Sequence, residues 1–263
     1  MAKAQAKPAP AQANKYDDEL AEFAKQFADQ ESAAAGGSFF GLGGGTLTFN
    51  GNPVPDNEMA VIVVDGIMEN VFYPGAYDPA TPQSPICFAF GRNELEMKPH
   101  VKSLHPQHPQ CKGCPHNEFG SADVGEGKAC RNTRRLAMIA AGNMEKGRFE
   151  PFDDTDHFET AQLAYMKLPV TSVKGYATFV KQLADSLKLP PFAVFTKVKV
   201  VKDPSKPRIP FKVIFESLAK APKALLEILK ARHEEAKTGI DFPYMASEEV
   251  EEVKPKAKAK RKY

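Results

Sequence analysis

The feature that most constrains the fold of this sequence is a group of four cysteines between residues 87 and 130. Cys111 and Cys114 form a C-x-x-C pair, Cys130 follows sixteen residues later, and Cys87 lies upstream in the segment SPICFAFGRN. A C-x-x-C turn places two thiolates side by side, and two further cysteines can complete a tetrahedral Zn²⁺ site. We therefore expect a zinc knuckle, with Zn as the cofactor and all four cysteines as its ligands.

Other roles stay open for these cysteines. They could be free thiols buried as small apolar side chains, although the surrounding window is rich in Gly, Pro and charged residues. Disulfides are disfavoured because the N-terminus lacks the pattern of a signal peptide, which predicts a reducing compartment. A thioredoxin-type redox site needs a strand before the C-x-x-C pair and a helix after it, and neither flank fits. His105, His108 and His116 are alternative ligands, so a histidine could replace one cysteine.

The segments around the cysteines resemble a known protein family. The segment CFAFGRN, followed by CKGCPHNEFGSADVGEGKACRNTRRLAMI, is similar to zinc-containing single-stranded DNA-binding proteins of tailed bacteriophages. Three family patterns occur in the same order, namely Cys-Phe, C-x-x-C-P-x-N-x-x-G-S and G-K-A-C-[KR]-x-x-R-R-L. The resemblance covers the chain from Gly45 to Phe215. It implies an OB-like β-barrel with a zinc knuckle, which coats exposed strands during phage DNA replication or recombination in the cytoplasm of the bacterial host. Replication or recombination proteins are the further partners that it implies.

Composition limits the classes of function. The chain has 263 residues, enough for one large domain or two small ones. No apolar run approaches the roughly 18 residues of a membrane helix, so we expect no membrane partner. We expect no small-molecule substrate either. The net charge is only +2, so binding of nucleic acid must come from local charge. Such an excess exists between residues 98 and 135, where seven Lys and Arg face three acidic residues.

Phosphate contacts supply sequence-independent affinity for nucleic acid, and aromatic side chains stack on bases. Phe88 and Phe90 alternate on one face of a predicted strand beside the first cysteine. Phe72, Tyr73 and Tyr77 are second choices for stacking. For each aromatic residue the alternative is packing in the core, and for the paired arginines it is a solvated strand edge. The expected nucleic-acid contacts are Phe88, Phe90, Arg92, Lys102, Lys112, Phe119, Lys128, Arg131, Arg134 and Arg135.

The predicted fold class is mainly β with flanking helices (α+β), built as an OB-like β-barrel with an inserted four-cysteine zinc knuckle. The expected organisation is a disordered tail at 1–16, a helix and Gly-rich hinge at 17–44, the nucleic-acid-binding domain at 45–217 with the knuckle at 87–135, a helix at 218–243, and an acidic-then-basic tail at 244–263.

Hydrophobic patterns predict the individual elements. Strands are expected at 46–49, 60–64, 70–73, 86–90, 134–142 and 162–167, and a hairpin is expected from 192–202 and 209–217. A helix capped by Thr171 or Ser172 should end before Pro190. Another helix is expected at 222–237, and an acidic loop at 145–156.

Two other functions compete with single-strand binding. The first is a zinc-ribbon adaptor that binds proteins of a replication or transcription complex. The second is a nuclease in which Asp153, Asp154, Asp156 and His157 bind a divalent metal ion, although a solvated acidic loop also explains this segment. The order of His, Glu and Cys residues is the reverse of that in zinc deaminases, and the HExxH and GxSxG motifs are absent. We therefore expect no enzymatic activity.

Overall fold

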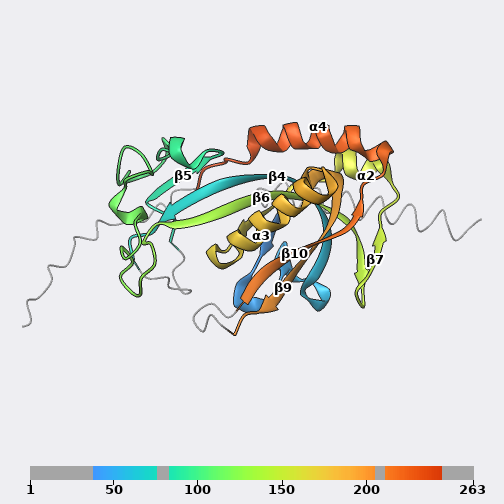
Figure 1. Cartoon of the computed structure of the whole chain (residues 1–263), viewed down its shortest axis with the longest axis horizontal. Coiled ribbons are helices and arrows are strands. Elements are labelled where there is room, and N and C mark those ends of the chain that lie inside the picture. Colours follow the sequence, from blue (N-terminus) through green and yellow to red (C-terminus); the bar gives the residue numbers. More distant parts are fainter. Residues whose placement is uncertain (1–37, 76–82, 205–210, 245–263) are drawn as a thin grey trace, which may run out of the picture.

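The structure is a computed structural model that describes residues 38–75, 83–204 and 211–244. It is a mixed α/β architecture dominated by one ten-stranded sheet with few helices (Figure 1). The strands are β1 (Ser38–Gly41), β2 (Thr48–Phe49), β3 (Asn52–Pro53), β4 (Glu58–Phe72), β5 (Cys87–Gly91), β6 (Arg131–Glu145), β7 (Arg148–Pro151), β8 (Ala164–Leu168), β9 (Val194–Lys202) and β10 (Phe211–Lys220). The α-helices are α2 (Thr155–Thr160), α3 (Val170–Gln182) and α4 (Lys223–Gly239), and the short helical turns are η1 (Gly43–Gly45), η2 (Pro55–Asn57), η3 (Glu94–Glu96), η4 (Pro115–Asn117), η5 (Leu183–Leu187) and η6 (Pro191–Ala193).

Two 15-residue strands, β4 and β6, form the centre of the sheet. They pair antiparallel over most of their length, from Ala60 opposite Gly142 to Val71 opposite Arg131. The strand order is β10-β9-β4-β6-β8-β1-β2-β3, while β5 pairs with one end of β4 and β7 with one end of β6. β1 and β8 form a parallel pair, and the other pairs in the described ranges are antiparallel.

The sheet is buried on both faces because its apolar side chains alternate between two cores. Along β4, Val61 and Val63 enter one core. Ile62 and Val64 enter the other. The helix α3 closes the first core, and α4 and α2 close the second (Figure 1). A strand that is apolar on both sides is typical of a sheet held between two helical layers.

The sheet is not a closed barrel, so the expected closed OB-like barrel is wrong. The strand order ends at β3 on one side and at β10 on the other, and no pairing joins these two edges within the described ranges. A barrel has a single interior. This sheet instead supplies apolar side chains to two cores, and each core needs its own helical cover. The coarser expectation of a β-rich chain with flanking helices agrees with the structure.

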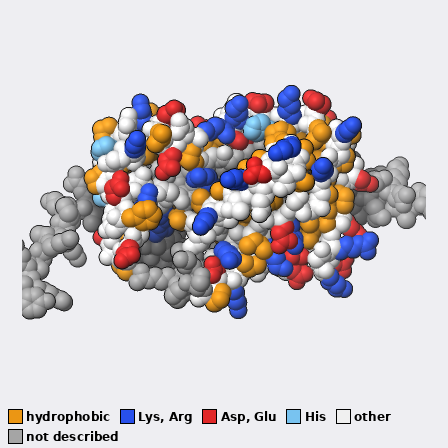
Figure 2. All heavy atoms as spheres, viewed as in Figure 1, with side chains coloured by type: hydrophobic (Ala, Val, Ile, Leu, Met, Phe, Trp, Pro, Cys, Tyr) orange, Lys and Arg blue, Asp and Glu red, His pale blue; other side chains and the backbone are white. Residues whose placement is uncertain are grey.

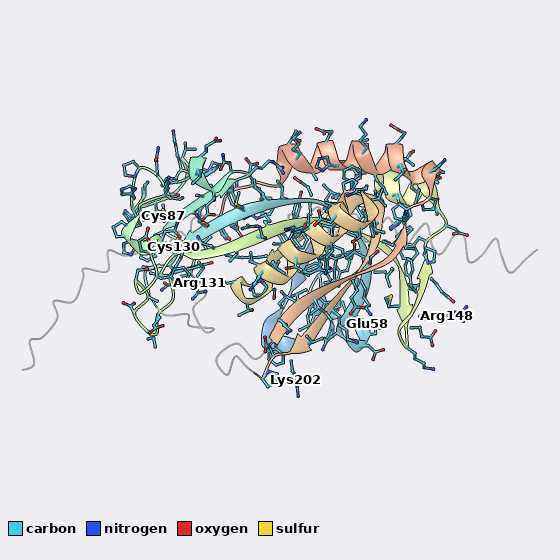
Figure 3. The ribbon with its side chains drawn as sticks, in the orientation of Figure 1. Glu58, Cys87, Cys130, Arg131, Arg148 and Lys202 are labelled. Atoms are coloured by element: carbon cyan, nitrogen blue, oxygen red, sulfur yellow. The ribbon has the colours of Figure 1, made fainter. Side chains whose placement is uncertain are left out.

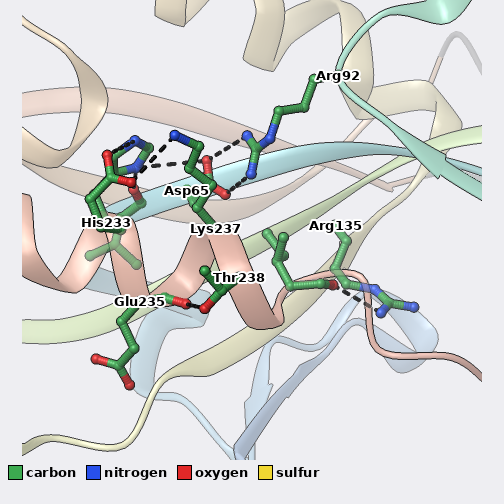
Figure 4. A network of polar contacts seen from close by, with 10 residues as sticks. Asp65, Arg92, Arg135, His233, Glu235, Lys237 and Thr238 are labelled. Carbon is green, nitrogen blue, oxygen red and sulfur yellow. Dashed lines mark hydrogen bonds and ion pairs between the residues drawn. The ribbon is translucent and has the colours of Figure 1, made fainter. Parts of the chain in front are cut away.

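The strand expected at residues 70–73 is not a separate element. It is the end of β4, which continues through a β-bulge beside Asp65. An acidic residue interrupts the apolar pattern here, but its carboxylate is buried with partners. Arg92 lies 2.5 Å from it and His233 lies 3.8 Å away (Figure 4). Such partners offset the cost of burying a charge, which keeps the strand continuous.

Three predicted elements are confirmed, namely the helix α3 with its extension η5, the hairpin of β9 and β10, and the helix α4. The predicted side-chain cap of α3 is wrong. Pro169 precedes the helix without a side-chain cap, and Ser172 Oγ instead accepts a hydrogen bond from the backbone N–H of Val213 at 2.9 Å. This bond ties α3 to β10, which lies at one edge of the sheet.

The segments expected to be hinge and loop contain further structure. The Gly-rich hinge includes β1 and η1, and the acidic segment 145–156 contains β7 and the start of α2. The expectations for residues 1–37 and 245–263, and for Tyr77, lie outside the described residues. Across the described ranges, no helix combines the length and apolar character needed to span a membrane.

Candidate nucleic-acid interface and cysteine cluster

The cysteines and several basic residues gather at one end of the sheet. Cys87 begins β5 and Arg131 begins β6 at this end, whereas Arg148 and Lys202 mark other parts of the sheet (Figure 3). Residues 92–130, which we call the knuckle region, connect β5 to β6. Successive side chains of β4 point to opposite faces of the sheet. Its even-numbered residues from 68 to 72 face the knuckle region, and Glu69 faces the chain that follows α4.

All four cysteines line one small cavity of about 20 Å³, which is room for a single water-sized or ion-sized occupant. Hydrogen bonds to backbone groups place two of them. The N–H of Cys111 donates to Met97 O at 2.9 Å, and the N–H of Cys130 donates to His116 O at 2.7 Å. Asn117 Nδ2 donates to Cys111 O at 2.9 Å and fixes the C-x-x-C turn. The structure therefore brings together the predicted ligand set, with every cysteine as a free thiol.

The protonation of the cysteines depends on their burial and on one another. Burial, with a smaller contribution from the neighbouring cysteines, raises the pKa of Cys130 to about 12. Burial also raises the pKa of Cys87 and of Cys111. A thiol, not a thiolate, is therefore favoured in the absence of a cation. A divalent cation would reverse this preference because metal ligation requires the thiolate.

The surroundings of the cysteines partly fit a zinc ion. Asn70 Nδ2 is buried, with no hydrogen-bond partner among the described residues. Burial raises the pKa of Cys111, and the nearby amide of Asn70 opposes this rise by favouring the thiolate. Ser103 and the backbone of Gln107 act in the same direction on Cys87. However, no three His, Cys, Asp or Glu side chains of the described residues are arranged so that they could hold one metal ion. Four-cysteine ligation therefore stays a prediction.

The histidines differ in their relation to the cavity. His108 and His116 line it, whereas His105 is not part of its lining. The ring of His116 stacks on Phe72 with centroids 4.2 Å apart, and His108 Nδ1 lies 2.7 Å from Gln110 O. These two histidines lie beside the cysteines but already have partners.

Phe88 is buried in this structure and does not form an open stacking surface, so its predicted role in binding nucleic acid stays a prediction. Its side chain is 2% exposed. The ring of His100 stacks on it at 5.1 Å between centroids, and Tyr244 approaches edge-on at 5.2 Å. A strand residue that faces outward from one core can thus be covered by a later segment of the chain.

Arg135 is also unavailable as a surface contact in this structure. Its guanidinium lies between the rings of Phe90 and Phe242, at 4.3 and 3.9 Å from their centroids. Its Nη2 atom lies 2.6 Å from Glu69 Oε1, and both side chains are buried. Arg135 is therefore covered on one side by Phe242, in the chain that follows α4, and on the other side by Phe90.

Arg131 forms an accessible group with two residues outside the expected set of contacts. Its guanidinium lies 5.2 Å from the ring centroid of Tyr73, and Lys167 Nζ lies 5.5 Å from the same centroid. Lys167 Nζ donates to Tyr73 Oη at 3.2 Å and to Tyr244 Oη at 2.7 Å. Arg131 is exposed, and Tyr73 and Lys167 are half-buried. We call Arg131, Tyr73 and Lys167 the cationic aromatic group.

A second cation–aromatic pair lies in the knuckle region. Phe119 is 81% exposed, and Lys128 Nζ lies 5.2 Å from its ring centroid. Lys102 and Lys112 are exposed in the same region. Lys and Arg side chains are interspersed with acidic ones over the face drawn in Figure 2. The basic residues thus form local groups on the molecule and do not make one continuous field on this face.

The remaining predicted contacts have internal partners. Arg92 binds Asp65 through both of its terminal nitrogens, which raises the pKa of the arginine. Arg134 is half-buried, and burial lowers its pKa while its Nη1 atom donates to Thr133 O at 3.0 Å. Both arginines are partly accessible, but each is held by the protein itself.

The acidic segment after β7 has a structural role in this fold. Asp154 caps α2 by accepting a hydrogen bond from the N–H of Asp156 at 2.9 Å. His157 Nε2 lies 2.8 Å from Ala140 O, and its ring packs against Phe152 and Phe158. These contacts account for the residues without a metal-binding or nuclease role.

Sequence analysis missed Lys167 and Tyr244. Lys167 is one polar residue within the short strand β8, and its neighbours in sequence carry no motif. Tyr244 was expected to begin the tail, but its hydroxyl donates to Glu69 Oε1 at 2.7 Å. The pairing of β6 with β8, which sets Arg135 opposite Lys167, brings Lys167 to the site, and the chain that follows α4 brings Tyr244.

Comparison with protein families, curated proteins and solved structures found no match to this chain. The resemblance to phage single-stranded DNA-binding proteins stays a prediction, and the functional argument proceeds from the geometry described above.

Proposed function

We propose that this chain is a single-stranded DNA-binding protein that coats exposed strands without sequence preference and without catalysis. The observation that carries the proposal is the cationic aromatic group, in which the guanidinium of Arg131 lies 5.2 Å from the ring centroid of Tyr73 and the ammonium group of Lys167 donates to the Tyr73 hydroxyl. Lys and Arg bind phosphates of any sequence. An aromatic ring stacks on any base, with a contribution of about 1–3 kcal/mol per base.

The position of this group supports the same interpretation. It lies at the end of the long central strands, where Tyr73 follows β4 and Arg131 begins β6. The exposed Phe119 and Lys128 add a second cation–aromatic pair in the adjoining knuckle region. Two such groups on one molecule suit a flexible strand, whose bases and phosphates can reach both. A rigid duplex keeps its bases stacked inside and offers them to neither ring.

We include a zinc ion in this proposal, held by Cys87, Cys111, Cys114 and Cys130. When bound, zinc would supply fixed links between the start of β5, the C-x-x-C turn and the start of β6. The chain itself already gathers these residues around one cavity. The biological setting that we propose, phage DNA replication or recombination, is supported by the sequence resemblance.

A titration of fluorescence anisotropy tests the proposal. Labelled oligo(dT) and a duplex of equal length are titrated with the full chain at two salt concentrations, after the metal content is measured. We expect tighter, salt-sensitive binding of the single strand. Arg131→Ala should weaken it and reduce the salt slope by about 0.7, the value for one phosphate contact on a single strand.

Arg148→Ala is the matched control, because Arg148 is an exposed arginine remote from the cysteine end of the sheet (Figure 3). It should leave the affinity and the slope unchanged. If both substitutions weakened binding of oligo(dT) equally, the affinity would depend only on the overall positive charge of the protein. Absence of any preference for the single strand would contradict the proposal.

A protein adaptor is the second candidate, and one observation favours it. Several large apolar side chains of the knuckle region are exposed to solvent, which is typical of surfaces that bind other proteins. They are Leu95, Val101, Leu104, Phe119 and Val124. Weak, salt-insensitive binding of oligo(dT) by the zinc-loaded chain would place this function first.

A further inference from the structure

The five residues after α4, Ile240–Tyr244, cross the sheet face that carries Glu69, and we call them the C-terminal strap. Two of its carbonyl groups bind one arginine. Arg135 Nη1 donates to Ile240 O at 3.1 Å and to Phe242 O at 2.6 Å. Figure 4 shows Arg135 beside the end of α4, where the strap begins. The strap is thus attached to the centre of the sheet through Arg135.

The two aromatic rings of the strap contact two of the predicted nucleic-acid contacts. The Phe242 ring lies 3.9 Å from the guanidinium of Arg135, whose other side faces Phe90. Tyr244 approaches Phe88 edge-on, with 5.2 Å between ring centroids. A flat ring placed against a guanidinium has the arrangement in which proteins bind unstacked bases.

We propose that the Phe242 ring of the strap imitates a nucleic-acid base, that it covers a second base-stacking surface centred on the guanidinium of Arg135, and that a bound single strand displaces it. This inference rests on the proposed function and concerns regulation of the same site. Displacement frees the Arg135 Nη1 donors that now bind strap carbonyls. It also removes the ring that covers the guanidinium of Arg135.

The strap adjoins the cationic aromatic group. Lys167 Nζ donates to Tyr73 on one side and to Tyr244 on the other. A strand that binds at Tyr73 and extends along the sheet therefore meets Tyr244 next. A phosphate bound to Lys167 would compete with the Tyr244 hydroxyl for the same ammonium group. This competition gives the bound strand a direct way to loosen the strap.

Three proteins test the inference by anisotropy with labelled oligo(dT). They are the full chain, the double variant Phe242→Ala/Tyr244→Ala, and a chain that ends at Tyr244. The double variant should bind oligo(dT) about tenfold tighter than the full chain, which corresponds to one or more stacking contacts becoming available to bases. The chain that ends at Tyr244 keeps the strap, so it shows separately what residues 245–263 contribute.

Equal or weaker binding by the double variant would overturn the inference, since it would mean that the strap rings either do nothing or contact the strand themselves. If none of the three proteins binds oligo(dT), the proposed function fails as well. Equal binding by full chain and double variant leaves the proposed function intact and removes only the inference.

Hydrogen exchange of the unmodified full chain gives a second test that does not depend on folding of a variant. Amide exchange in residues 240–244 should become faster when oligo(dT) is bound, because the strap leaves the sheet. Slower or unchanged exchange in these residues, measured with the strand bound, would overturn the inference. Thermal unfolding of the double variant, followed by circular dichroism, shows whether α4 remains in place.

Discussion

Glu69 and Arg135 form a buried ion pair on adjacent central strands. Glu69 Oε1 lies 2.6 Å from Arg135 Nη2, and the two side chains are 0% and 5% exposed. Glu69 also accepts hydrogen bonds from Thr133 Oγ1 at 3.1 Å and from Tyr244 Oη at 2.7 Å. This pair therefore connects β4 and β6 to the segment that follows α4.

Neutralising one member of the pair should destabilise the fold. Glu69→Gln leaves Arg135 as a buried charge without its partner, and we expect a loss of about 3–5 kcal/mol in the free energy of unfolding. Urea unfolding of the purified chain measures this loss of stability. Glu145→Gln is the control, because Glu145 pairs with Lys146 at the surface, where both side chains are exposed. The control should lose at most about 1 kcal/mol. Similar losses in both variants would contradict the role of the buried pair.

Substitutions of Phe88 and Phe119 should differ in their effects on the stability of the fold and on the binding of oligo(dT). Phe88→Ala removes a buried ring and should lower the free energy of unfolding by about 3–5 kcal/mol. Phe119→Ala removes an exposed ring and should change stability by less than about 0.5 kcal/mol, while it weakens binding of oligo(dT). Urea unfolding and anisotropy are measured on both variants. A stable Phe88→Ala chain would show that its ring is not part of the core.

Local patterns were sufficient to predict the elements with strong periodicity. The helix α3, the hairpin of β9 and β10 and the helix α4 follow directly from apolar spacing and proline positions. The convergence of the four cysteines around one cavity also agrees with their spacing. These elements could be predicted because their interactions join residues that are close in sequence, and the cysteine group could be predicted because its members are all of one residue type.

The architecture and the contact residues could not be predicted in this way. β4 continues through Asp65 because Arg92 and His233, which lie far along the chain, surround its carboxylate. Phe88 and Arg135 are covered by residues 242–244, more than 100 positions later. Burial imposed by distant segments leaves no local pattern, so alternation alone assigned these side chains to the surface.

Loss of one cysteine should remove the proposed metal. Native mass spectrometry of the full chain should show one bound zinc ion, and Cys114→Ser should show none. Lys112→Ala is the control because Lys112 is exposed within the same turn and offers no thiolate. It should retain the metal. Unchanged zinc in Cys114→Ser would rule out the proposed ligand set.

The metal-free chain should lose stability as the pH rises above about 9. The pKa of Cys130 is raised from 9.0 to about 12 in the folded protein, mainly by burial. The folded state therefore holds its proton over a range in which the unfolded state releases it, and stability falls between pH 9 and 12. Denaturant unfolding across this range measures the effect.

Cys130→Ser provides the comparison for this pH dependence because serine does not titrate there. The metal-free variant should lose less stability between pH 9 and 12 than the metal-free parent. Tyr176 and Tyr244 also have a pKa raised by burial and contribute in the same direction in both proteins. Identical pH profiles would show that Cys130 is not buried as a thiol.

Photo-crosslinking tests the central claim most directly, because it asks which residues touch the strand. Oligo(dT) that carries 5-iodouracil is irradiated with the full chain, and the attached peptides are identified by mass spectrometry. The account predicts adducts at Tyr73, which contacts the charged groups of Arg131 and Lys167. Crosslinks confined to residues far from the cysteine end of the sheet, or none at a concentration where anisotropy shows binding, would contradict it.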